Sequence, residues 1–197
     1  MRIQGFVLTG GASRRMGRNK AAILMSGQTL AQNAVNTLRE FCGEVFTVGG
    51  QAGFSDAEHL IDIEPPFAVE GRAAMTGIYT ALRSCRAEFA AVLACDMPNV
   101  TADVFRILID KLKDHEGCDA VIPVDAEGKT QQLCAVLHRE RCLAAIERLP
   151  ADRTPAVKEM LALLNVVECP FAEFPHLPHA KRLFANLNTP EELSEKR

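Results

Sequence analysis

The feature that most limits the possible folds is an alternation of short apolar runs with longer segments of helical periodicity. This alternation is typical of βα units, so we expect an α/β fold with a mainly parallel central sheet and helices on both faces. Strands are expected over residues 3–9, 44–48, 59–63, 89–94, 118–124, 132–137 and 165–169. The run at 89–94 is apolar throughout, as expected of a central strand buried on both faces.

The spacing of the last strands predicts one antiparallel strand in this sheet. Residues 118–124 and 132–137 lie only a hairpin's distance apart, across Asp125-Ala126-Glu127-Gly128. Such a short connection joins antiparallel strands, whereas parallel strands need a long crossover. The antiparallel strand is therefore expected in the second half of the chain.

Helices are expected at residues 30–41, 75–82 and 104–112, with two more between 137 and 165. Thr29-x-x-Gln32 has the pattern of a capping box. The second of the two later helices is expected to start at Thr154-Pro155, with Thr154 as N-cap and proline at the first helical position. Thr189-Pro190-Glu191-Glu192 predicts the start of a short terminal helix.

Length and composition exclude several classes of protein. The chain has 197 residues without a repeat or linker, so we expect a single domain over residues 1–197. It is 48% hydrophobic and 24% charged, which fits a globular protein. The net charge of −3 provides no overall basic field for nucleic acid, and no apolar run approaches the roughly 20 residues of a membrane helix. With no signal-like start, a cytoplasmic location is expected.

The seven cysteines predict neither disulfides nor a zinc site. Their number is odd and no two form a Cys-x-x-Cys pair, so we expect buried thiols in a reducing compartment. His176 and His179 frame two residues in His-Leu-Pro-His, without a third ligand. We expect a turn there and no metal.

The loop after the first strand has the composition of a phosphate-binding site. Gly10 and Gly11 stand at the strand's carboxyl end, where glycines let backbone N–H groups turn towards an anion. Four cations follow within seven residues: Arg14, Arg15, Arg18 and Lys20. A charge run is often only a solvated face, but its position after a strand and a glycine pair favours polyphosphate.

Residues 8–20 fit neither common phosphate loop. Gly17 is followed by Arg18, so the Gly-Lys-Ser/Thr of a Walker loop is missing, and Gly10-Gly11 does not give Gly-x-Gly-x-x-Gly. The run Leu8-Thr9-Gly10-Gly11-Ala12-Ser13-Arg14-Arg15-Met16-Gly17-Arg18-Asn19-Lys20 instead resembles the signature of the nucleotidyltransferase superfamily, Leu-x-Gly-Gly-x-Ser-x-Arg-Met-Gly-x-x-Lys.

Two further segments extend the resemblance. Residues 90–98 form an apolar strand that ends in Asp96-Met97-Pro98. A carboxylate there, facing a phosphate loop, is well placed to hold Mg²⁺ against a triphosphate, although a turn or helix-capping role is the alternative. Residues 186–193, Asn-Leu-Asn-Thr-Pro-Glu-Glu-Leu, resemble the ending of molybdenum cofactor guanylyltransferases. The chain is similar to that family in order from residue 6 to residue 193.

This resemblance implies a Rossmann-like nucleotidyltransferase fold and a Mg²⁺-dependent transfer of GMP from GTP to the phosphate of molybdopterin. GTP, the molybdenum cofactor and molybdoenzyme apoproteins or their chaperones are the implied partners. Carried over by position, the catalytic residues are Arg15, Lys20 and Asp96, with Asp96 as the metal ligand. The nucleotide-binding residues are Leu8, Thr9, Gly10, Gly11, Lys20, Asp62 and Asp96. Asn186 and Asn188 are placed towards the pterin.

Two departures from the family pattern keep other functions open. The family's Gly-Pro-Leu-x-Gly corresponds to residues 71–77, which keep only Gly77 in register, and Gly49-Gly50 stands where the family often has asparagine. A molybdopterin cytidylyltransferase is one rival, although it usually has Ala-Ala-Gly where this chain has Thr9-Gly10-Gly11. A sugar-phosphate nucleotidyltransferase is a second rival, although those enzymes are commonly longer. A non-catalytic carrier of nucleotide or pterin is a third, and it would bind nucleotide without releasing pyrophosphate.

Overall fold

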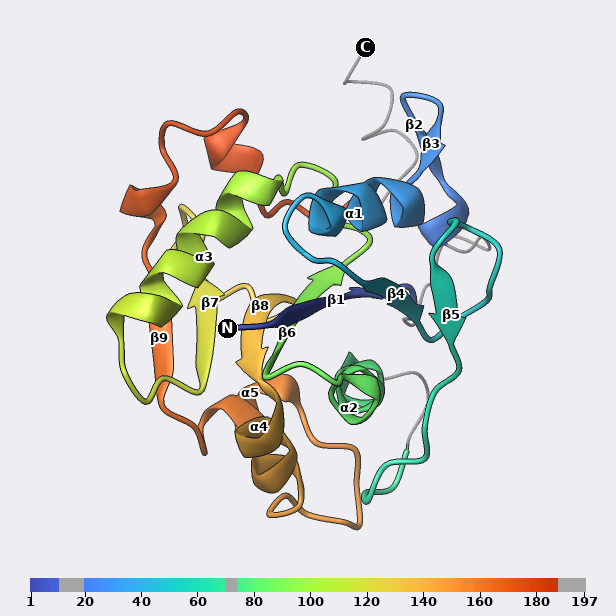
Figure 1. Cartoon of the computed structure of the whole chain (residues 1–197), viewed down its shortest axis with the longest axis vertical. Coiled ribbons are helices and arrows are strands. Elements are labelled where there is room, and N and C mark those ends of the chain that lie inside the picture. The colour runs from blue at the N-terminus through green and yellow to red at the C-terminus, as the bar shows by residue number, and fades with distance from the viewer. Residues whose placement is uncertain (11–19, 70–73, 188–197) are drawn as a thin grey trace.

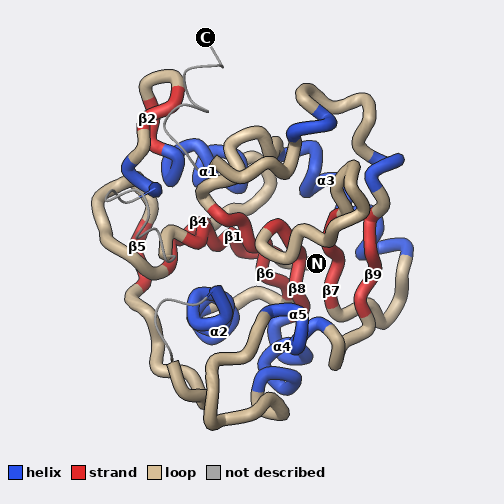
Figure 2. The backbone as a smooth tube through the Cα atoms, turned by 180° about the vertical axis from the view of Figure 1, so that it is seen from behind, coloured by secondary structure: helices blue, strands red, loops and turns tan. Residues whose placement is uncertain are grey.

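The computed structural model describes residues 1–10, 20–69 and 74–187. A seven-stranded sheet with the order β5-β4-β1-β6-β8-β7-β9 runs through its centre, between helices (Figures 1 and 2). The strands are β1 (Ile3–Leu8), β4 (Val45–Val48), β5 (Glu58–Leu60), β6 (Phe89–Ala94), β7 (Ala120–Pro123), β8 (Cys134–His138) and β9 (Val166–Cys169). The helices are α1 (Leu30–Arg39), α2 (Ala74–Ser84), α3 (Ala102–Asp114), α4 (Arg139–Ile146) and α5 (Val157–Leu161).

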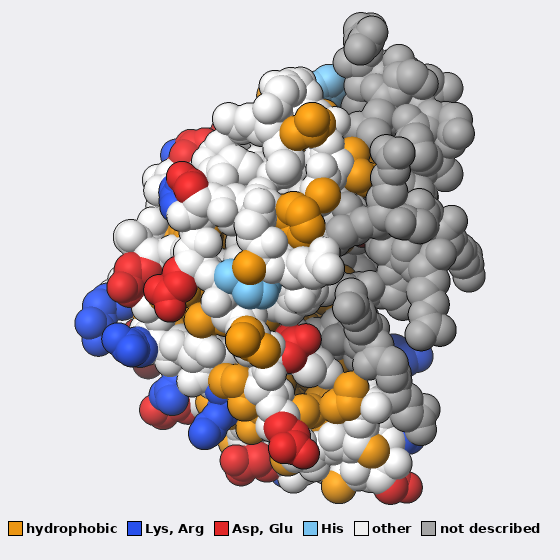
Figure 3. Space-filling model, turned by 90° about the vertical axis from the view of Figure 1, so that its right-hand side faces the viewer, with side chains coloured by type: hydrophobic (Ala, Val, Ile, Leu, Met, Phe, Trp, Pro, Cys, Tyr) orange, Lys and Arg blue, Asp and Glu red, His pale blue; other side chains and the backbone are white. Residues whose placement is uncertain are grey.

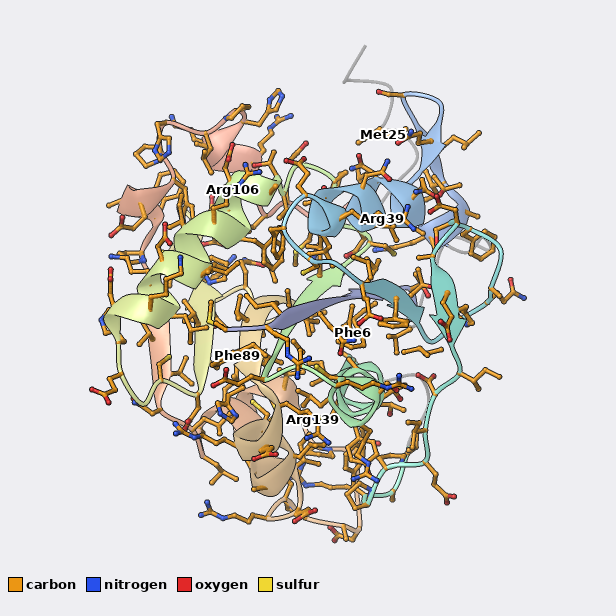
Figure 4. All side chains as sticks on the ribbon, in the orientation of Figure 1. Phe6, Met25, Arg39, Phe89, Arg106 and Arg139 are labelled. Carbon is orange, nitrogen blue, oxygen red and sulfur yellow. The ribbon has the colours of Figure 1, made fainter. Side chains whose placement is uncertain are left out.

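The helices form a layer on each face of the sheet, as expected. In Figure 1, α1 and α3 lie on one side of the strands and α2, α4 and α5 on the other. Alternate side chains of β1 serve the two layers, since Val7 belongs to the core cluster of α1 and α3 and Phe6 to that of α2 and α4. Phe6 lies between β1 and α2 (Figure 4). The fold is therefore a three-layer α/β arrangement.

One strand, β8, runs against the others. It pairs antiparallel with both β6 and β7, while β5, β4, β1 and β6 are parallel to one another and β7 is parallel to β9. The predicted antiparallel hairpin is confirmed, and β6 has the expected bounds with all six residues buried. Because only β8 is reversed, the carboxyl ends of β5, β4, β1, β6 and β7 meet at one edge of the sheet.

The cap of one helix and the start of another differ from prediction. Thr29 caps α1 as expected by accepting a hydrogen bond from the Gln32 backbone N–H, at 3.0 Å. The Gln32 side chain does not close the capping box, because its Oε1 accepts from the backbone N–H of Asp56. The prediction for Thr154 is wrong: α5 begins at Val157, and the Thr154 hydroxyl donates to the carbonyl of Ala68 instead.

Smaller elements and one exposed edge complete the described structure. A hairpin of β2 (Leu24–Met25) and β3 (Gln28–Thr29) precedes α1, and short 3-10 turns occupy Lys20–Ala22, Phe171–Glu173 and Ala180–Arg182. Strand β5 is shorter than expected and forms one edge of the sheet. On the side of the molecule shown in Figure 3, hydrophobic side chains lie scattered among acidic and basic ones. Within the described ranges, no helix is both long and apolar enough to cross a membrane.

Candidate active site

The candidate site is built on three adjacent strands that end together. Leu8 of β1 is in register with Val48 of β4 on one side and with Ala94 of β6 on the other. Beyond the strands, the Thr9 backbone N–H donates to the Val48 carbonyl at 2.9 Å, and the Cys95 backbone N–H donates to the Leu8 carbonyl at 3.1 Å. The residues after all three strands are thereby fixed side by side, at the edge where open α/β sheets bind ligands.

Thr9 joins the first loop to the turn after β4. Its hydroxyl is buried and lies 2.6 Å from the Gly49 carbonyl oxygen, to which it donates. Gly50 packs closely against the backbone of Thr9, because a Cβ atom added at Gly50 would lie 2.8 Å from the Thr9 carbonyl oxygen. Both Gly49 and Gly50 have a φ of +70°, a conformation that favours glycine. In the sequence this glycine pair stands out only as a departure from the family pattern, whereas in the structure it forms the contact between two loops of the site.

Asp62 reaches this turn from the neighbouring strand. A Cβ atom on Gly49 would lie 3.0 Å from Asp62 Oδ1, so the carboxylate lies directly against the Gly49 backbone. The Gly49 backbone N–H donates to the carbonyl of Leu60, the last residue of β5, at 3.1 Å. The structure thus brings Asp62 to the same edge of the sheet as Leu8, Thr9 and Gly10.

Lys20 and Asp96 meet on the other side of Leu8. The Lys20 ammonium lies 3.0 Å from Asp96 Oδ2, which joins the end of the first loop to the end of β6 across 76 positions of sequence. Ala21, in the 3-10 turn that begins with Lys20, is fully buried and anchors that turn. The two side chains are 18% and 23% exposed, so a ligand can still reach them. A cation and a carboxylate at this position can act together on a phosphate and its metal.

The thiol beside Asp96 belongs to the core. Burial, with the charge of Asp96 as the second cause, raises the pKa of Cys95 to about 12. The side chain therefore stays a neutral thiol at physiological pH and is no nucleophile. All seven cysteines are buried and free, as expected from their surroundings in the sequence.

The chain's last described segment also reaches the site. The Leu187 backbone N–H donates to the Asp96 carbonyl at 2.9 Å, which places its exposed neighbour Asn186 beside the Lys20–Asp96 pair. Gly11, Arg15 and Asn188 lie outside the described residues, as does the helix expected at 189–192. His176 and His179 lie in turns, as predicted. In the part of the chain that the structure describes, no three His, Cys, Asp or Glu side chains group as a metal site.

Comparison with known proteins agrees with this geometry. Residues 5–166 match the family model of the MobA-like NTP transferase domain. The molybdenum cofactor guanylyltransferase of Desulfosudis oleivorans is 30% identical, with 98% of this chain and 93% of that protein covered. A probable molybdenum cofactor guanylyltransferase of Halalkalibacterium halodurans is 28% identical, with 97% and 96% covered.

The three-dimensional fold is also similar to that of a solved structure. The crystal structure of molybdopterin-guanine dinucleotide biosynthesis protein A from Archaeoglobus fulgidus superposes with a TM-score of 0.76 at 26% identity. The superposition covers 98% of this chain and 95% of that one. With a family model that spans most of the sheet and a shared fold, the chain belongs to the MobA-like NTP transferases and is a nucleotidyltransferase.

Proposed function

We propose that the protein transfers GMP from GTP to the phosphate of molybdopterin, forming a guanine dinucleotide cofactor and releasing pyrophosphate. The family and the names of its relatives support this reaction. The observation that carries the proposal is the Lys20–Asp96 pair, which joins a phosphate-type loop to the carboxyl end of β6. Charge of both signs at one sheet edge suits a magnesium triphosphate better than an uncharged ligand.

The reaction asks for alignment and charge neutralisation more than for proton transfer. An oxygen of the molybdopterin phosphate attacks the α-phosphorus of GTP, and the bond from that phosphorus to the oxygen bridging to the β-phosphate breaks. The electron pair leaves with pyrophosphate. Because the attacking oxygen is already anionic, no general base is needed.

Lys20 is proposed to hold the phosphates. In the free protein its ammonium is paired with Asp96 at 3.0 Å, and a triphosphate entering between the two loops offers it oxygens of higher charge. Arg15, outside the described residues, is proposed as a second phosphate contact. Both cations would offset the negative charge that develops on the leaving pyrophosphate.

Asp96 is proposed to hold Mg²⁺. A single carboxylate fits this ion, because magnesium in nucleotide sites usually takes one or two carboxylates and completes its shell with phosphates and water. When bound, the ion would neutralise charge on the phosphates.

The nucleoside is proposed to lie between the ends of β1, β4 and β5. Leu8, Thr9, Gly10 and Gly11 would contact the guanine or ribose, and the Asp62 carboxylate would accept hydrogen bonds from it. The glycines at 49 and 50 leave this wall as bare backbone. Asn186 and Asn188 would contact the pterin, and the hydrogen bond from the Leu187 backbone N–H to the Asp96 carbonyl brings the chain next to Asn186 to this end of β6.

The test is a transfer assay with purified protein, molybdopterin and either GTP or CTP, with and without Mg²⁺. We expect pyrophosphate and the guanine dinucleotide to appear together, with GTP and Mg²⁺ only. Product from CTP instead would move the protein to cytidylyl transfer. Binding of GTP without pyrophosphate release would favour the non-catalytic carrier.

A further inference from the structure

One buried hydroxyl near the sheet edge of the candidate site has no hydrogen-bond partner among the described residues. Thr76 lies in the first turn of α2, its side chain is 8% exposed, and Oγ1 has no hydrogen-bond partner among the described residues. A buried hydroxyl without a partner destabilises the free protein. Such an unmet group needs an explanation, and a ligand that supplies the missing partner is one explanation.

The helix contacts on either side show which way Thr76 faces. Thr80, one turn later on the same side of α2, accepts a hydrogen bond from the Ile63 backbone N–H at 2.9 Å. Residues 76 and 80 therefore face the chain that follows β5, and Asp62 is the residue before Ile63. Gly77, the next residue of α2, lies against Leu8, because a Cβ atom there would be 3.3 Å from Leu8 Cδ2.

These two contacts place the first turn of α2 near Leu8 and Asp62, the residues proposed to lie next to the nucleoside. In the view of Figure 1, α2 packs against β1 and β4 from below the sheet. Between these two residues the wall at Gly49 and Gly50 has no side chain. Thr76 is thus a polar side chain of α2 close to these residues, and the hydroxyl of Thr80 on the same side is already bonded to Ile63.

We infer that Thr76 is a further nucleotide-binding residue, whose hydroxyl hydrogen-bonds the nucleoside part of the substrate beside Asp62. The inference rests on the proposed function and adds a residue to it. The Asp62 carboxylate only accepts hydrogen bonds, whereas a threonine hydroxyl both donates and accepts. The group that fits between them presents a donor to Asp62 and a lone pair to Thr76.

Two parts of GTP have this chemistry. A ribose hydroxyl combines donor and lone pair in one group, and guanine has the O6 acceptor beside its N1–H donor. Binding of nucleotide analogues distinguishes the ribose hydroxyl from the guanine edge as the group that is bonded. GTP analogues without the 2′- or 3′-hydroxyl lack the ribose group. ATP keeps the ribose but has donor and acceptor exchanged on the base, with an N6–H₂ donor in place of O6 and a lone pair on N1 in place of N1–H.

The experiment compares Thr76→Val with the wild-type protein, since valine keeps the shape and removes the hydroxyl. Thr101→Val is the matched control, because Thr101 Oγ1, at the start of α3, is also buried without a partner among the described residues. The dissociation constants for GTP, its 2′- and 3′-deoxy analogues and ATP are measured by calorimetry. The Tm of each free protein is measured in parallel.

For Thr76→Val we expect GTP binding to weaken about three- to tenfold, the range of one net hydrogen bond. Both variants should raise the Tm of the free protein, because each replaces an unpaired buried hydroxyl by an apolar group. Only Thr76→Val should also narrow the wild-type preference for GTP over the deoxy analogue or over ATP, and the analogue affected identifies the bonded group. A merely structural hydroxyl would not change this preference.

Equal GTP affinity of Thr76→Val and wild type would overturn the inference while leaving the proposed function standing. If the wild-type protein itself binds no nucleotide, the proposed function fails and the inference fails with it. Weaker GTP binding in Thr101→Val by the same factor would also contradict the assignment, since it would show that the loss does not depend on the position of Thr76.

Discussion

Thr9 and Gly50 show how a site can depend on backbone contact between two loops. The Thr9 hydroxyl donates to the Gly49 carbonyl, and the space for any side chain at Gly50 is taken by the Thr9 carbonyl oxygen. The first loop and the turn after β4 are therefore held at one spacing. That spacing sets where the backbone of Thr9 and Gly10 lies at the edge proposed to bind the nucleotide.

Gly50→Ala is expected to damage both stability and binding. Its φ of +70° alone costs an alanine about 1–2 kcal/mol, and the contact at 2.8 Å forces Thr9 to move as well. Gly53→Ala is the control, because Gly53 also has a positive φ, of +89°, but nothing lies within 4 Å of an added Cβ. Thermal unfolding with and without GTP should show a larger loss of Tm for Gly50→Ala, together with weaker nucleotide binding. Equal losses in the two variants would contradict the close contact.

Residues in a recognisable motif could be predicted, and residues defined by spatial approach could not. Lys20 and Asp96 follow from the first loop and from a strand that ends in aspartate, and the structure places them 3.0 Å apart. The role of Gly49-Gly50 depends on how closely β4 and β1 approach at their ends, and Thr76 on which side of α2 faces the sheet edge. Neither is visible in a local pattern.

The start of α5 shows the same limit for a secondary-structure element. Thr154-Pro155 has a good helix-start pattern, yet the helix begins at Val157, because Glu159 provides the cap by accepting from the Ala156 backbone N–H at 2.8 Å. Arg153 also pairs with the Glu159 carboxylate, at 2.6 and 3.0 Å. Two competing caps lie within six residues, and only the tertiary contact of Thr154 with Ala68 decides between them.

This cap makes one helix start sensitive to acid. Hydrogen bonds from Arg153, and then from the Ala156 backbone, lower the pKa of Glu159 from its usual 4.5 to about 2. Because the folded-state pKa is the lower one, the stabilisation is present above about pH 4.5 and is lost as the pH falls towards 2. Glu159→Gln should therefore have a lower Tm than wild type at pH 6, with a gap that closes as the pH falls through this window. A gap independent of pH would contradict the assigned cause, and Arg153→Gln should reproduce the effect.

At the scale of the whole molecule, the reactivity of the seven buried thiols can be used to test whether the core is packed. They are distributed over both helical layers and the central strands, and burial raises the pKa of each one, for example that of Cys42 and Cys142 to about 12. Titration with a thiol reagent at pH 8 should therefore modify far fewer than seven cysteines in the native protein and all seven after denaturation. Rapid reaction of most thiols without denaturant would contradict the packing.

The strand content of the sheet could be predicted from the sequence, but its order could not. Apolar runs and the hairpin at Asp125–Gly128 indicate the strands and one antiparallel pair. That β8 inserts between β6 and β7 depends on how helix α3 and the later connections pack, which no local pattern records. The meeting of the first loop with the end of β6 was expected from the motifs in these two segments, whereas the positions of the other strands were not.

The most direct measurement is the GTP-dependent turnover of Lys20→Ala and Asp96→Ala, with pyrophosphate release as the readout. Lys113→Ala is the control, because Lys113 forms a similar ion pair with Asp110 on the exposed side of α3, at 2.8 Å. Circular dichroism and Tm verify that each variant is folded. We expect both site variants to lose several orders of magnitude in turnover while the control keeps wild-type activity. Unchanged turnover in either site variant would contradict the assignment of the Lys20–Asp96 pair as the catalytic centre.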